Sequence, residues 1–115
     1  RPDLTRSELR SWMLHRRLSG HLTLTTLETW LPKIERSLVR EREFVRGSVH
    51  LRNLDRWTEL VERRDVLGLH RVLTGLDRGS IEMREVSPMG GLLSEEERID
   101  VMDDLRETYR APRSA

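Results

Sequence analysis

Residues 51–75 read LRNLDRWTELVERRDVLGLHRVLTG, and this stretch decides the fold. Its apolar residues recur every three or four positions, the spacing that places side chains on one side of a helix. The first series is Leu51, Leu54, Trp57, Leu60 and Val61, and the second is Val66, Leu69, His70 and Leu73. A helix with such a stripe must bury it, so we expect two neighbouring helices here, with the flanking segments packed against them.

The first helix is marked by its N-terminal residues. Thr5 and Glu8 form a capping box, in which the Thr hydroxyl binds a backbone amide three residues on and the Glu carboxylate binds back. Gly20 suits the left-handed residue that ends many helices. The sequence therefore predicts a helix near residues 6–18.

A second capping box, Thr25 with Glu28, predicts a helix that continues to about Arg46 and stops at Gly47. Pro32 lies inside this segment. Because proline lacks a backbone donor and clashes with the preceding turn, we expect it to kink the helix or to split it in two.

The two central helices have polar residues at their expected starts. Ser48 or Asn53 should cap the first helix, which ends near Arg63, and Asp65 should cap the second, which Gly75 closes. The corner between the two helices is too short to be more than a turn. We therefore expect them to be neighbours joined at a sharp angle.

Residues 76–91 interrupt the helical pattern. The alternation of apolar and charged residues over 81–86 fits either a short strand or a helical turn. A strand there could pair only with residues 44–51, which would make a two-stranded β-ribbon. Residues 87–91 read SPMGG, and a proline with two glycines predicts a loop.

The last helix begins at a third capping box, Ser94 with Glu97. Acidic residues in its first turn and arginines in its last turn complement the helix dipole. Its expected buried side is made of Ile99, Met102, Leu105 or Arg106, and Tyr109. Residues 111–115 should be a frayed tail.

These patterns predict an all-α fold, a compact bundle of four or five helices with one irregular segment at residues 76–93. Residues 1–110 should make a single domain, the usual size for a chain of 115 residues. The chain has no cysteine and no apolar run of the ~20 residues that a membrane span requires. No signal peptide is apparent, so we expect a cytoplasmic protein without a membrane partner.

Charge is distributed unevenly along the chain, with a net +3 over residues 33–75 and a net −5 over residues 76–110. Such asymmetry can guide the choice of partner, although attraction within the fold or plain solvation explains it as well. The basic residues are twenty Arg and one Lys. This bias is typical of a GC-rich genome, and we expect a bacterial or phage protein.

The sequence contains none of the motifs GxxxxGK[ST], GxGxxG, GxSxG and HExxH, which mark many phosphate-binding and catalytic sites. Its four histidines make no pair with a carboxylate at metal-ligand spacing. His70 lies on an apolar face and fits a hydrogen-bonded core or boundary residue. We therefore expect no catalytic residue, no cofactor and no metal site, and a protein that is not an enzyme.

The expected function is that of a protein-interaction module, a small regulator, inhibitor or antitoxin-type protein that binds another protein. The acidic side of the last helix either meets a basic partner or only faces solvent, and the loop before it offers further contacts. The predicted partner-binding residues are Asp100, Asp103, Asp104, Glu107, Pro88, Met89 and Leu92. Any of Trp12, Trp30 and Trp57 that reaches the surface would add binding energy.

The alternative function is a nucleic-acid-binding regulator with a helix-turn-helix around residues 63–65. Phosphate binding requires clustered basic side chains, and the candidates are Arg52, Arg56, Arg63 and Arg64. Acidic residues are interleaved with the arginines of this region and leave no clean basic stripe. A homo-oligomer that buries a tryptophan at its interface is a third class.

Overall fold

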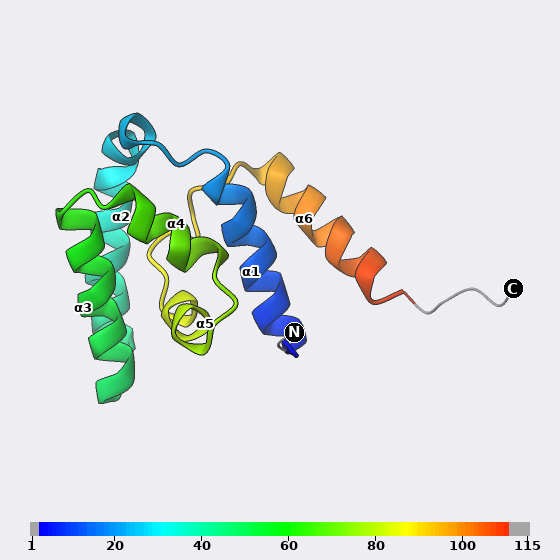
Figure 1. Ribbon diagram of the computed structural model, residues 1–115, viewed down its shortest axis with the longest axis horizontal. Helices are drawn as coiled ribbons and strands as arrows, with labels where there is room; N and C mark the ends of the chain where they lie inside the picture. The colour runs from blue at the N-terminus through cyan, green and yellow to red at the C-terminus, as the bar shows by residue number, and fades with distance from the viewer. Residues whose placement is uncertain (1–2, 111–115) are drawn as a thin grey trace, which may run out of the picture.

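The computed structural model describes residues 3–110, which form six helices and, within that range, no strand (Figure 1). In chain order the helices are α1 (Arg6–Ser19), α2 (Leu24–Phe44), α3 (Ser48–Glu62), α4 (Val66–Thr74), α5 (Arg78–Glu85) and α6 (Glu95–Thr108). The all-α prediction is confirmed. The expected number of four or five helices is wrong, as is the β-ribbon. The predicted tail at 111–115 lies outside the described residues.

The core forms around α3 and α4, as the apolar stripes of residues 51–75 predict. Leu54, Trp57, Leu69 and Leu73 are completely buried. Burial of a large apolar side chain stabilises a fold by about 1.5–3 kcal/mol. The Trp57 ring also donates a hydrogen bond of 2.7 Å from Nε1 to the carbonyl of Met83, and this bond ties α3 to α5.

Helix α5 occupies eight residues of the segment 76–93 that was expected to be irregular. Asp77 caps it, because its carboxylate accepts hydrogen bonds from the Ser80 amide at 3.0 Å and the Ser80 hydroxyl at 2.7 Å. These two bonds lower the pKa of Asp77. The helix has eight residues, about two turns. A segment this short does not separate a helical period from an alternating one.

Helix α2 starts before the predicted position. Its capping box pairs Thr23 with Thr26, so the predicted box of Thr25 with Glu28 is wrong. The Thr26 hydroxyl takes the place of the usual carboxylate and accepts a hydrogen bond of 2.8 Å from the Thr23 amide. The helix continues as one element through Pro32, which lies on its exposed side, and the predicted split is not observed.

The turn between α2 and α3 depends on a glycine rather than on a polar cap. Gly47 has φ 92°, a left-handed conformation that strains any residue with a side chain. The two predicted caps are wrong, because Ser48 is the first residue of α3 and Asn53 is buried within it. Gly20, predicted to be left-handed, has φ −65°.

The substitution Gly47→Ala should lower the free energy of unfolding by about 1–2 kcal/mol, since a Cβ at this φ crowds the backbone carbonyl. Gly90→Ala is the matched control, because its Cβ would also meet open space but its φ is not positive. The control should change the unfolding free energy by less than about 0.5 kcal/mol. Urea unfolding measures both variants. Equal effects would contradict a conformational role for Gly47.

Arg84 lies on α5 and is only 4% exposed although it is charged. Its Nη1 donates hydrogen bonds to the carbonyls of Val72 at 2.8 Å and Gly75 at 2.7 Å, at the C-terminal end of α4. The helix dipole makes that end negative, so the cation satisfies both the carbonyls and the partial charge. Burial lowers the pKa of Arg84, and the negative charge of Asp77 opposes this shift.

Replacing this cation by an apolar side chain, Arg84→Met, should destabilise the fold by about 2 kcal/mol, because the buried carbonyl of Val72 and the half-buried carbonyl of Gly75 lose a charge-assisted donor. Arg71→Met is the control, since Arg71 is exposed on α4 and should tolerate the change. Thermal and urea unfolding would measure the difference. Unchanged stability in Arg84→Met would mean that the desolvation penalty of the buried charge cancels its hydrogen bonds.

Candidate protein-interaction site

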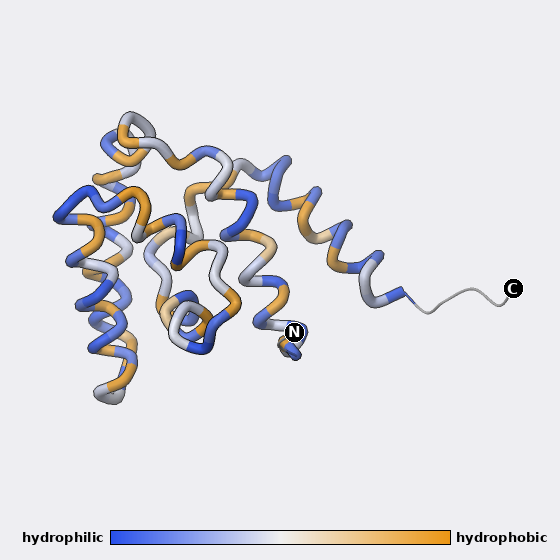
Figure 2. Tube along the Cα trace, in the orientation of Figure 1, coloured by the Kyte–Doolittle hydropathy of each residue, from blue (hydrophilic) through white to orange (hydrophobic). Residues whose placement is uncertain are grey.

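Helix α6 lies at one edge of the molecule, and α1 is its main packing partner (Figure 1). Its buried residues are Val101 and Leu105. Ile99 and Tyr109 are 50% and 44% exposed, so the prediction that they are buried is wrong. Hydrophilic residues recur along the whole of α6 (Figure 2). Such weak amphipathicity leaves the buried side ambiguous in the sequence.

The start of α6 is held by a polar contact with the turn after α1. The Ser94 hydroxyl accepts a hydrogen bond of 3.2 Å from the Glu97 amide, so Ser94 caps α6 as predicted. The Glu97 carboxylate binds His21 Nε2 at 2.8 Å and lies 3.8 Å from Arg17. The hydrogen bond with His21 is the main cause that lowers the pKa of Glu97.

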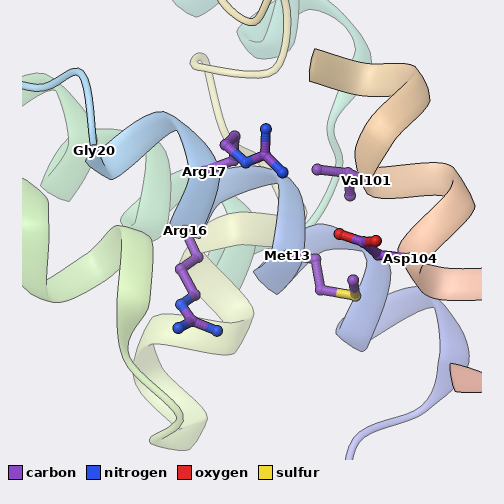
Figure 3. A pocket seen from close by; sticks show the side chains of 6 residues that line it. All are labelled: Met13, Arg16, Arg17, Gly20, Val101 and Asp104. Atoms are coloured by element: carbon purple, nitrogen blue, oxygen red, sulfur yellow. The ribbon is translucent and has the colours of Figure 1, made fainter. Parts of the chain in front are cut away.

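The contact between α1 and α6 is partly open. A cleft of about 350 Å³ lies between them and is lined by Met13, Arg16, Arg17, Gly20, Val101 and Asp104. Figure 3 shows Asp104 pointing from α6 towards α1, with Arg17 across the cleft and Arg16 directed away. Asp100 lies 4.0 Å from Arg17. Two of the four predicted acidic residues are therefore turned towards α1.

The other two acidic residues, Asp103 and Glu107, face outwards. They pair with Arg106 at 2.9 Å and Arg110 at 3.3 Å, on the same helix. Pairs of this kind stabilise a helix by only about 0.2–0.5 kcal/mol, so another cation can replace either arginine at little cost. Ile99, Asp103 and Glu107 follow one another at intervals of four residues, and we call these three the outer row of α6.

The loop before α6 does not present the residues that were expected to bind a partner. Pro88 and Met89 are buried, and Leu92 is half-buried against the core. The Met89 amide donates a hydrogen bond of 3.0 Å to the Ser87 hydroxyl within this loop. The expected exposure of Pro88 and Met89 is therefore wrong, because the loop is packed into the core.

No tryptophan is exposed in the described part of the chain. Trp57 is completely buried, and Trp12 and Trp30 are half-buried. The Trp12 ring donates a hydrogen bond of 2.9 Å from Nε1 to the carbonyl of Thr74, between α1 and α4. Among the described residues, the aromatic side chains that do reach solvent are Phe44, at 74% exposure, and Tyr109, at 44%.

The four arginines proposed for nucleic-acid binding do not form one free cluster. Arg63 pairs with Glu59 at 3.1 Å, and Arg64 pairs with Glu28 at 2.8 Å. Arg64 also donates to the Val61 carbonyl at 2.8 Å and adopts φ 53° in the corner between α3 and α4. Arg52 and Arg56 are exposed on α3.

A basic groove that the sequence did not indicate lies beside α2. It has a volume of about 270 Å³ and is lined by Lys33, Arg36, Ser37, Arg40, Pro88, Gly91 and Leu92. None of its three cations has a carboxylate oxygen within the 4.0 Å of an ion pair among residues 3–110. Their spacing of three and four residues indicates that the three cations share one side of a helix. The acidic residues on the other sides of α2 obscured this pattern in the sequence.

Two histidines are held by hydrogen bonds in the interior or at its boundary. His70 Nε2 lies 3.1 Å from the Leu22 carbonyl, which confirms its expected role. His15 is buried and lies 2.6 Å from the Ser11 carbonyl through Nδ1 and 2.8 Å from the Ser87 hydroxyl through Nε2. Burial lowers the pKa of His15 to about 4, although the bond to Ser11 opposes the shift.

Among residues 3–110 no group of three or more His, Asp or Glu side chains is placed to hold a metal ion. No helix in the same range is both long and apolar enough to cross a membrane. No family model, curated protein or solved structure matches the chain.

The stability of the protein should fall as the pH is lowered from 6.5 to 4, because His15 binds a proton in the unfolded chain over this range but stays neutral in the folded chain. The contribution is fully present above pH 6.5 and amounts to about 3 kcal/mol, at 1.36 kcal/mol for each pKa unit. Urea unfolding at several pH values should show that the unfolding free energy of His15→Gln changes less with pH than that of the unmodified protein. An NMR titration midpoint of His15 above 6 would contradict this assignment.

Proposed function

We propose that this chain is a non-enzymatic protein-interaction module, a small regulator, inhibitor or antitoxin-type protein that binds a basic surface of another protein. The observation that carries the proposal is the outer row of α6. Asp103 and Glu107 are 60% and 66% exposed, and the exposed Ile99 adjoins them. A cytoplasmic location and a bacterial or phage origin belong to the same proposal.

A partner with a basic surface would gain both charge pairs and apolar contact from the outer row of α6. Two carboxylates with weak pairs on their own helix can accept hydrogen bonds from Arg or Lys of another protein without leaving a buried charge unpaired. Ile99 supplies apolar area beside them, and such area provides most of the free energy when it is removed from water. Complementary charge accelerates the encounter and sets the orientation.

The nucleic-acid alternative has less support. Arg63 and Arg64 are already paired with Glu59 and Glu28. Only Arg52 and Arg56 remain on α3 for phosphate contacts, and specific duplex binding uses more contacts than two side chains supply.

A pull-down from lysate of the source organism tests the proposal. The tagged protein should capture a stoichiometric partner in nuclease-treated and untreated samples alike. The variant Asp103→Asn/Glu107→Gln should reduce capture by about tenfold or more, the loss expected when a few good charge pairs are removed.

The control is Glu35→Gln/Glu43→Gln, which makes the same chemical change at two exposed positions of α2 and should leave capture unchanged. Loss of the partner after nuclease treatment would favour the nucleic-acid alternative. Capture that does not respond to the α6 variant would remove α6 from the binding surface.

A further inference from the structure

The basic groove beside α2 continues into an exposed aromatic residue. Arg36, Arg40 and Phe44 follow at intervals of four residues and therefore lie along one side of the helix. Arg36 and Arg40 line the groove, and Phe44 is the most exposed large hydrophobic residue of those described, at 74%. We call these three residues the groove row of α2.

The outer row of α6 has the same spacing as the groove row and carries the opposite charge. Each row has three residues at intervals of four, about 6 Å along a helix. Each carries two like charges and one exposed apolar side chain at one end. If α2 and α6 of two copies lie antiparallel, Phe44 is opposite Ile99, Arg40 is opposite Asp103, and Arg36 is opposite Glu107.

We infer that the groove row of one copy binds the outer row of α6 of a second copy, so that the chain associates with itself head to tail. This inference names a partner for the surface on which the proposed function rests. The two rows cannot meet within one chain, because α2 and α6 lie on opposite sides of the molecule (Figure 1). The partner in this contact is therefore another molecule.

Antiparallel alignment also suits the backbone. The negative C-terminal end of α2, at Phe44, then lies beside the positive N-terminal end of α6. The exposed phenyl and isoleucine side chains leave water together, while the charged pairs stay near solvent at the rim. Rim pairs of this kind are weak and screened by salt, so the association should be modest in strength and sensitive to ionic strength.

The contact is heterologous, because the two surfaces that meet are different. Each bound pair of copies leaves one groove row and one outer row free, so the same contact can be repeated and yields a ring or an open chain of copies. A bound copy also covers the outer row of α6. Self-association and capture of another protein through α6 should therefore compete.

Sedimentation velocity on the full chain, freed of nucleic acid, tests the inference. The protein should associate reversibly at about 50 mM salt and should dissociate at about 500 mM salt. Reversing the charge of the groove row with Arg36→Glu/Arg40→Glu should leave it monomeric. Reversing the outer row with Asp103→Lys/Glu107→Lys should do the same.

Mixing the two variants gives the decisive result. In each variant alone the two rows carry like charges, whereas in the mixture each row finds a partner of opposite charge. The mixture should therefore associate at least as well as the unmodified protein. The control Arg52→Glu/Arg56→Glu makes the same charge change on α3 and should leave the association intact.

Because the chain has no cysteine, single cysteines can test the register. Phe44→Cys mixed with Ile99→Cys should form a disulfide-linked dimer under mild oxidation. Leu67→Cys is the control partner for Ile99→Cys, since Leu67 is equally exposed at 72% but lies on α4, and it should cross-link several-fold less.

A chain that stays monomeric at low salt and high concentration would overturn the inference, as would association that the α3 control abolishes equally. Association that disappears when bound nucleic acid is removed would also overturn it. A monomeric protein that still captures a partner from lysate through α6 would overturn the self-association alone and leave the proposed function standing.

Discussion

The arrangement of the short helices depends on the hydrogen bonds that the buried guanidinium of Arg84 makes. It bonds the carbonyls of Val72 and Gly75 at the end of α4, and the adjacent Met83 carbonyl receives the ring of Trp57 from α3. Three helices thus meet at two successive residues of α5. The same cation lies near His15 on α1, and its charge helps to keep that imidazole neutral. A polar junction of this kind specifies one packing of helices among the several that apolar side chains alone would allow.

Two places on the surface differ in the sign of their charge, the groove beside α2 and helix α6. Three cations of α2 line a groove without carboxylate partners among the described residues, whereas seven of the fourteen residues of α6 are acidic. Attraction within one chain does not neutralise these two surfaces, since α1 and the core lie between them (Figure 1). The net charge of +1 therefore describes the molecule poorly. A molecule that approaches the groove meets three cations, and one that approaches α6 meets a helix in which acidic residues outnumber arginines.

The sequence predicted best where helices are long and one-sided. Leu54, Trp57, Leu69 and Leu73 are buried as their spacing indicates, because a core-facing stripe repeats often enough to be recognised. The sequence did not resolve α5, which is too short to show a period. It predicted α6 and its cap at Ser94, but it assigned Ile99 and Tyr109 to the buried side wrongly, because acidic residues nearly surround this helix. The basic groove was hidden for a different reason. Its lining comes from α2 and from the distant loop at residues 88–92, which only the tertiary fold brings together.

Met89 is the last residue of the buried core cluster along the chain, and no residue of α6 belongs to this cluster. Its side chain anchors the loop in the core, so the body that ends there is complete without the helix that follows. Helix α6 is joined to this body mainly through α1, against which it buries Val101 and Leu105, and through the polar bridge from Glu97 to His21. Its amides should then exchange with solvent through a local opening of low free energy, while the amides of α3 and α4 exchange only through global unfolding.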